Sequence, residues 1–123
     1  MPIVFSDHKL PSGELYLRMV SSEEIGHADC DALSAQLDRP EHRMGKAISV
    51  IETSSRASAE IRERLGGFGS RYSAIATVVT SPILRAMVNI MSRLAPAEEN
   101  HKTFKDEASA IAWLDRQPWL RDE

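Results

Sequence analysis

The chain has 123 residues, of which 42% are hydrophobic and 27% are charged. This composition is typical of one folded domain, here residues 1–123, and it excludes a disordered chain. The net charge of −3 offers no basic patch to a phosphate backbone, so we expect no nucleic-acid partner. The first residues lack the features of a signal peptide, and no stretch is apolar for long enough to span a bilayer. We therefore expect a cytoplasmic protein without a transmembrane segment, whose single cysteine, Cys30, forms no internal disulfide.

Two strands joined by a tight turn are predicted at the start of the chain. Ile3–Phe5 is short and apolar, and Glu14–Val20 alternates apolar with polar residues. Between them, Pro11 fixes one backbone angle and Gly13 accepts a positive φ, a combination typical of a chain reversal. The pattern predicts a β-hairpin.

A helix and a buried strand are predicted next. Ser21 or Ser22 is placed to cap the helix, two glutamates follow in its first turn, and Pro40 ends it. After a polar loop, Ala47–Ile51 is a β-branched run suited to an interior strand. The apolar stripe of the helix consists of Ile25, Ala28, Ala32, Leu33 and Leu37.

The second helix is predicted to follow the hydroxyl cluster Thr53–Ser55 directly. Its apolar residues Ala57, Ile61 and Leu65 recur at intervals of four. The glycines of Gly66–Gly69 come after this helix and before a strand, whereas a phosphate-binding loop follows a strand and opens a helix. We therefore predict that the glycine run is a helix stop.

The second half of the chain contains two further strands and two further helices. Tyr72–Val79 gives the strongest strand signal and is expected inside the sheet, whereas the partly polar His101–Phe104 is expected at an edge. Ser81 opens a third helix with proline at its first position, and Asp106 caps the last one. The third helix has the apolar residues Leu84, Met87, Val88, Met91, Leu94 and Ala95, and we expect Leu84, Met87, Val88 and Met91 to face Ile75 and Val79. The last helix has Ala108, Ile111, Ala112 and Leu114.

These elements predict an α/β domain with a mixed β-sheet of about five strands flanked by four helices. The predicted order is β-β-α-β-α-β-α-β-α. Because helices alternate with strands after the hairpin, the crossovers are expected to be right-handed and to place helices on the faces of the sheet.

A family resemblance rests mainly on the second half of the chain. Its pattern is Phe68-Gly69, the strand ending Ala74-Ile75-Ala76-Thr77-Val78-Val79, the amphipathic third helix, Phe104-Lys105-Asp106-Glu107-Ala108, and Ala112-Trp113-Leu114. Residues 13–18 match more loosely. This pattern resembles the SpoIIAA-like proteins, which are bacterial relatives of the STAS and Sec14-type domains. The resemblance implies a compact α/β domain with a mixed sheet, and it implies little about activity.

The resemblance also draws attention to the segment after the third predicted strand. In the anti-sigma-factor antagonists of this family, a loop with Asp-Ser-Ser holds a serine whose phosphorylation controls partner binding. This chain has Glu52-Thr53-Ser54-Ser55 there, and Arg56-Ala57 where Gly-Leu is usual. The resemblance thus implies a switch at Ser54 or Ser55, with Thr53 and Arg56 beside it, where a phosphate would add about −2 charge. From the residues alone, we favour an ordinary helix cap.

The chain offers little for catalysis or metal binding. His27 and Cys30 lie one helical turn apart, but the other histidines are scattered and there is no second cysteine to complete a site. No nucleophile elbow, P-loop or zinc-protease motif is present. We therefore expect no enzyme activity, no cofactor and no metal, and we interpret Cys30 as a residue near the core.

The leading functional hypothesis is a binding or regulatory domain whose partner is a protein, which can be a second copy of the chain. Trp119 and Leu120 form a candidate interface, because Pro118 ends the last helix and leaves two large apolar residues in the tail. The alternative is a carrier of a small apolar or lipid-like molecule, in which the adaptable Met87 and Met91 line a pocket. An enzyme without a recognisable motif is the third hypothesis.

Overall fold

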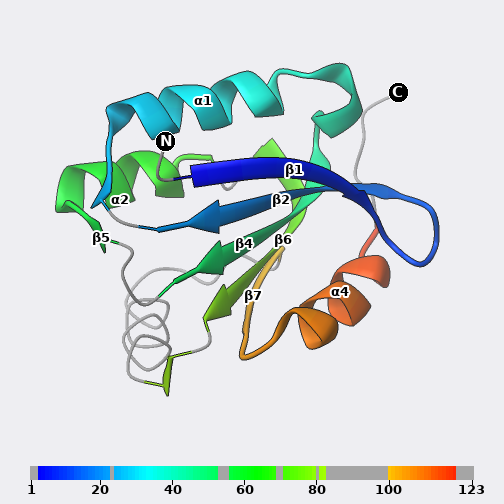
Figure 1. Cartoon of the computed structure of the whole chain (residues 1–123). Helices are drawn as coiled ribbons and strands as arrows, with labels where there is room; N and C mark the ends of the chain where they lie inside the picture. The colour runs from blue at the N-terminus through cyan, green and yellow to red at the C-terminus, as the bar shows by residue number, and fades with distance from the viewer. Residues whose placement is uncertain are drawn as a thin grey trace.

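The protein folds around a five-stranded mixed sheet (Figure 1). The computed structural model describes residues 3–22, 24–52, 56–68, 71–79, 81–82 and 100–118. The strand order across the sheet is β1-β2-β4-β6-β7; β1 is antiparallel to β2, and each following pair is parallel. The strands are β1 (Ile3–Lys9), β2 (Leu15–Ser21), β4 (Gly45–Ile51), β6 (Tyr72–Val79) and β7 (His101–Phe104).

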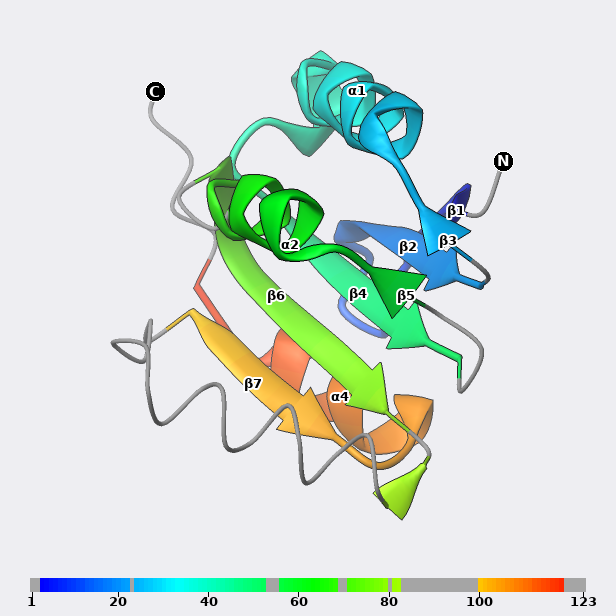
Figure 2. The same cartoon turned by 90° about the vertical axis from the view of Figure 1, so that its left-hand side faces the viewer.

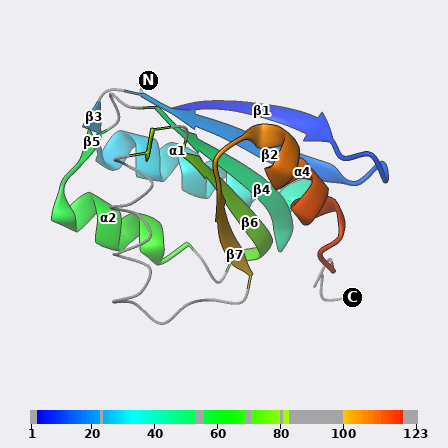
Figure 3. The same cartoon turned by 90° about the horizontal axis from the view of Figure 1, so that it is seen from below.

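Helices cover the two faces of the sheet unequally. Helices α1 (His27–Leu37) and α2 (Ala59–Gly66) lie on one face, and α4 (Glu107–Asp115) lies on the other (Figures 1 and 3). A short 3-10 helix, η1 (Pro40–His42), follows α1. Among the helices that the structure describes, none combines the length and the apolar character needed to cross a membrane.

Each face of the sheet has its own apolar core. Under α1 and α2, the buried residues include Leu17 and Met19 of β2 with Leu33 and Leu37 of α1. The predicted core residue Cys30 belongs to this cluster and is fully buried. Under α4, the buried residues are Leu10, Tyr16, Ile48, Ala74, Ala76, Val78, Ala110 and Leu114.

The structure confirms the predicted hairpin and its turn. Leu10 N donates to Glu14 O at 2.7 Å, and Gly13 N donates to Leu10 O at 2.8 Å. Gly13 has a φ of 94°, which a residue with a side chain adopts only at a cost. The first strand is longer than predicted, because polar residues continue it from Ser6 to Lys9 at the edge of the sheet.

Both helix starts in the first half of the chain were predicted wrongly. Ser21 stays in the sheet between β1 and β4, and Glu24–Ile25 forms a short strand, β3, that pairs with β5 (Arg56–Ala57). Helix α1 begins only at His27. Gly26 is the N-cap, and the Asp29 carboxylate in the first turn accepts a hydrogen bond from Gly26 N at 3.0 Å, which is the return bond of a capping box.

Helix α2 likewise begins after β5 and not at the hydroxyl cluster. Its N-cap is Ser58, whose Oγ accepts a hydrogen bond from Ile61 N at 3.2 Å. Ala57, predicted in the helix, belongs to β5. The backbone pairing between β3 and β5 therefore replaces the first turn that periodicity predicted for each helix.

The structure confirms the predicted strand β6, the end of the second helix and the cap of the last helix. Strand β6 has the predicted bounds and lies between β4 and β7, and β7 is at an edge. Helix α2 ends at Gly66, as predicted from the glycine run, and Asp106 caps α4 by accepting a hydrogen bond from Ser109 N at 2.7 Å. The described residues thus contain three α-helices around the mixed sheet. Most of the predicted third helix, together with its contacts to Ile75 and Val79, lies outside the described residues.

Candidate functional site

A continuous row of apolar side chains crosses the face of the sheet on which α4 lies. Its members occupy directly opposed positions on successive strands, so their side chains point to the same face. We call these residues the valine row: Val4 of β1, Val20 of β2, Val50 of β4 and Val78 of β6. Phe104 of β7 stands next to Val78 and continues the row to the other edge.

Burial along the valine row is greatest at Val78 and least at Val4. Helix α4 packs against β4, β6 and β7, and Val78 beneath it is 1% exposed. Val20 and Val50 are half-buried, and Val4 is 61% exposed. Among the described residues, Val4 is the one large hydrophobic side chain that is exposed. Figures 1 and 2 show the reason, since α4 lies across the β6 and β7 side and leaves β1 uncovered.

Polar contacts border the valine row. The Arg18 guanidinium on β2 makes two hydrogen bonds to the Glu107 carboxylate at the start of α4, at 2.6 and 3.1 Å. These bonds hold the pKa of Glu107 below its usual value. On β1, the Ser6 hydroxyl lies 2.9 Å from His8 Nε2, and the His8 ring stacks on Tyr16 at 5.6 Å between ring centroids. Burial raises the pKa of the Tyr16 phenol. The border of the row is thus hydrogen-bonded and ordered.

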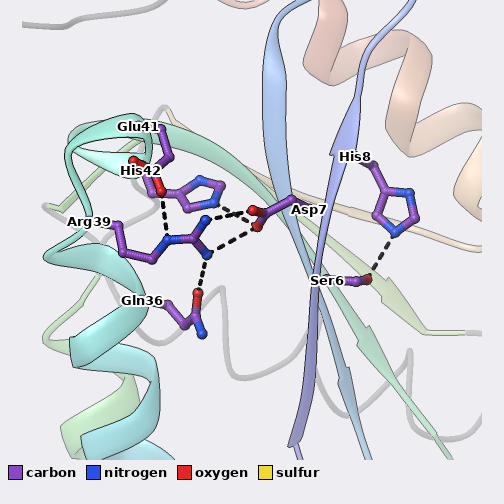
Figure 4. Close-up of polar contacts among 7 residues, drawn as sticks. All are labelled: Ser6, Asp7, His8, Gln36, Arg39, Glu41 and His42. Atoms are coloured by element: carbon purple, nitrogen blue, oxygen red, sulfur yellow. Dashed lines mark hydrogen bonds and ion pairs between the residues drawn. The ribbon is translucent and has the colours of Figure 1, made fainter.

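On the opposite face, a polar cluster holds β1 in place (Figure 4). The Asp7 carboxylate accepts hydrogen bonds from Arg39 Nη2 at 2.6 Å and Nη1 at 3.3 Å, and it lies 2.9 Å from His42 Nε2. Arg39 also donates to Glu41 at 2.7 Å and to Gln36 at 2.6 Å. We call these five residues the Asp7 cluster. It connects the edge strand to the segment that joins α1 to β4.

The Asp7 cluster has the geometry of a structural tie. His42 is 1% exposed, and among the described residues the one hydrogen-bond partner of its ring is Asp7. Nucleophilic catalysis requires a hydroxyl or thiol beside the imidazole, and within this described region the ring contacts none by hydrogen bond. The bonds from Arg39 and His42 lower the pKa of Asp7, so the carboxylate stays ionised in the folded protein.

Two further polar features lie within the sheet. Lys46 of β4 is almost fully buried, and its Nζ donates to Glu14 Oε1 at 2.7 Å. On the face covered by α1 and α2, Thr77 Oγ1 of β6 lies 2.8 Å from His101 Nε2 of β7. In both features the polar side chains satisfy one another, as buried polar groups generally do.

The structure brings together few of the residues singled out from the sequence. Thr53, Ser54 and Ser55 lie outside the described residues, and so do Trp119 and Leu120. Of Arg56, only the backbone pairing in β5 with β3 is described.

His27 and Cys30, which lie one helical turn apart in the sequence, have different surroundings in the structure. Cys30 is enclosed in the core, where burial raises the pKa of its thiol, whereas His27 lies at the surface 3.4 Å from Glu60. No group of three potential metal ligands is found among the described residues.

The valine row was missed because no local pattern signals it. Val4, Val20 and Val50 lie in separate segments of the sequence, and only the pairing register aligns them. The sequence does show that each segment is either apolar or alternates apolar with polar residues. This pattern does not tell which residues of neighbouring strands lie opposite each other.

Comparison with known proteins supports the fold. No protein-family model and no curated protein matches the chain. A crystal structure of an uncharacterized protein of the DUF3478 family with a SpoIIAA-like fold, from Shewanella loihica PV-4, is similar to it. The likeness covers 91% of this chain and 93% of that chain, with a TM-score of 0.66 and 15% identity. The chain therefore has the SpoIIAA-like fold that the sequence resemblance implied.

Proposed function

We propose that this protein is a non-enzymatic binding domain that docks a protein partner on the exposed end of the valine row. The observation that supports this proposal is the exposure of Val4, which lies in register with residues that pass into the core under α4. An isolated exposed valine is common on protein surfaces. A valine that continues a buried apolar row marks a place where a further layer can be added to the fold.

The energetic gain from covering this position is sufficient to affect an affinity. Full burial of a valine side chain stabilises by about 1.5–3 kcal/mol. Because Val4 is 61% exposed, covering it contributes about 1–2 kcal/mol, which corresponds to roughly a tenfold change in a dissociation constant.

The strand that carries Val4 is also held rigidly. The Asp7 cluster fastens β1 from the other face, and β2 pairs with it along its whole length. A fixed docking surface loses little conformational entropy when a partner binds, so more of the contact energy appears as affinity.

The other functional hypotheses lack such support. The helix that would line the pocket of an apolar-ligand carrier lies mostly outside the described residues, and no described contact favours this alternative. Control by phosphorylation at Ser54 or Ser55 likewise stays a prediction, as does self-association through Trp119 and Leu120.

A matched pair of substitutions tests the proposed function. Tagged protein is purified from its own host in three forms: parent, Val4→Asp and Ala59→Asp. Ala59 is exposed at the start of α2 on the opposite face, where an acidic residue is well tolerated. We expect a co-purifying protein to be retained by Ala59→Asp and lost from Val4→Asp, with both variants folded. Equal recovery with all three forms would refute the docking surface.

A further inference from the structure

Strand β1 is the outer strand of the sheet, and on one side of its backbone no other described strand lies beside it (Figures 1 and 3). It has seven residues, whereas β7 at the other edge has four. Its pairing with β2 runs from Ile3 to Lys9 without a bulge, and the strand contains no proline. Short length, bulges and prolines are features by which proteins protect an edge from further pairing. Strand β1 lacks all three.

The hairpin determines which main-chain groups of β1 point away from β2. Leu10 N donates to Glu14 O at 2.7 Å, so these two residues form a hydrogen-bonded pair where the hairpin closes. Because bonded and non-bonded pairs alternate along an antiparallel ladder, Lys9 and every second residue before it direct their N–H and C=O groups to the free edge. The bond of 3.4 Å from Ile3 N to the Asp29 carboxylate agrees with this alternation. The outward-facing residues are Ile3, Phe5, Asp7 and Lys9.

The side chains of this edge leave one charge unmatched. Charged side chains at an edge oppose pairing with another strand, but the Asp7 carboxylate already accepts hydrogen bonds from Arg39 and lies 2.9 Å from His42. Lys9 is exposed, and no carboxylate in the described part of the chain pairs with it. An acidic residue of a partner beside Lys9 would complete the charge pattern of the edge.

We infer that the partner protein contributes an extended segment, which pairs with the free edge of β1 and adds a strand to the sheet. This inference rests on the proposed function and specifies the conformation of the partner. Phe5, Asp7 and Lys9 together offer about six main-chain hydrogen bonds to such a strand. The added strand places an acidic residue beside Lys9, and on the other face it places an apolar residue beside the exposed Val4. Main-chain pairing supplies affinity, and the two side-chain contacts supply specificity.

Other occupants fit this edge less well. A docked helix uses its main-chain groups within itself, so the outward N–H and C=O groups of β1 would stay unpaired. Two copies of β1 related by a two-fold axis pair antiparallel, and full overlap of residues 3–9 places Ile3 opposite Lys9 and Phe5 opposite Asp7. Each apolar residue would then lie beside a charged one, and Lys9 would gain no acidic neighbour.

Site-specific photocrosslinking measures the conformation of the bound segment. The full chain is produced in its own host with the photoreactive residue p-benzoylphenylalanine at Val4, at His8, or at Ala59 as the control. Val4 and His8 are exposed and point to the same face of β1, about 13 Å apart. After irradiation, mass spectrometry identifies the partner residue that is attached to each position.

The spacing of the attached residues distinguishes the occupants. Positions 13 Å apart should attach to partner residues about four apart in an extended strand. A spacing of about nine would indicate a helix, and attachment to peptides of this chain would indicate a second copy. Either of these results would overturn the added strand and leave the docking surface standing. Attachment no greater than at Ala59 would overturn the proposed function as well.

A matched pair of substitutions at Lys9 tests the main-chain pairing itself. Lys9→Ala removes the charge and keeps the outward N–H, whereas Lys9→Pro removes both; an edge strand tolerates proline where the N–H faces away from the ladder. In calorimetric titrations with the co-purified partner, Lys9→Ala should bind about two- to fivefold more weakly than the parent. Lys9→Pro should bind a further two- to tenfold more weakly, roughly the net contribution of one hydrogen bond.

Equal affinities for these two variants, with circular dichroism like that of the parent, would overturn the added strand. Parent-like affinity of Lys9→Ala would overturn the acidic residue beside Lys9. If Lys9→Pro fails to fold, the spacing of the crosslinks decides.

Discussion

The buried ion pair between Lys46 and Glu14 allows a sharp test of how the hairpin is joined to the sheet. The Lys46 side chain is 0% exposed and that of Glu14 is 35% exposed, with 2.7 Å between Nζ and Oε1. We predict that the two halves of this pair respond very differently to removal. Glu14→Ala should be strongly destabilising, whereas Lys46→Met should be nearly neutral.

The asymmetry follows from where the charge is left. Removing one partner of a buried pair costs about 3–5 kcal/mol, because the remaining charge stays without compensation. Glu14 is partly exposed, so water reaches its position and we expect the lower end, about 3 kcal/mol, for Glu14→Ala. Lys46→Met removes the buried charge and keeps the volume, and it should change the free energy of unfolding by less than about 1 kcal/mol.

Urea unfolding at pH 7 measures both effects. With a slope of about 1.5 kcal/mol per molar urea, Glu14→Ala should lower the midpoint by about 2 M. The double variant Glu14→Ala, Lys46→Met should regain most of the stability that Glu14→Ala loses. The reasoning would be refuted if Glu14→Ala cost less than Lys46→Met, or if the double variant were the least stable of the three.

Three further predictions concern single side chains. Arg39 lowers the pKa of Asp7 in the folded protein. The contribution of Asp7 to the free energy of unfolding is therefore complete above the unfolded pKa near 3.8 and is lost as the pH falls through the folded pKa. Asp7→Asn should be less stable than the parent at pH 7, and unfolding curves should show this difference in stability shrinking below about pH 4. Ser58→Ala removes the cap of α2 and should cost about 1 kcal/mol in thermal unfolding; no loss would argue against the cap. Cys30 is fully buried with a raised thiol pKa, so it should react with a thiol reagent only after unfolding, and fast labelling of the native protein would contradict its place in the core.

The elements that could be predicted are those fixed by neighbouring residues. The turn at Pro11 and Gly13 and the stop at Gly66 depend on backbone preferences that act over a few residues. Strand β6 could be bounded because a long β-branched and apolar run lies after the glycine stop. In each case the local preference and the final structure agree.

The errors occurred where pairing between distant segments decided the structure. Glu24 and Ile25 are expected at the start of the first helix, from the acidic first turn and the apolar stripe, but their backbone pairs with Arg56 and Ala57. Because Arg56 and Ala57 are in that pairing, α2 begins after them, with Ser58 as its N-cap. A contact over thirty residues leaves no trace in the periodicity of either segment, so sequence patterns favoured the helix.

The candidate site could not be predicted for a related reason. Its central property is the exposure of Val4 beside the buried Val78, which depends on the register of four strands and on the placement of α4. The sequence shows valines in several strands, but not which of them a helix leaves uncovered.

The dissociation constant of the complex with the co-purified partner tests the central claim most directly. Isothermal titration calorimetry is performed with the parent, Val4→Asp and the control Ala59→Asp. Because Asp removes the apolar contact and also adds a charge that must be desolvated, we predict at least a tenfold weaker complex for Val4→Asp. Ala59→Asp should bind like the parent. Val4→Asp binding within about twofold of the parent, with its fold intact, would contradict the assignment of the valine row as the docking surface.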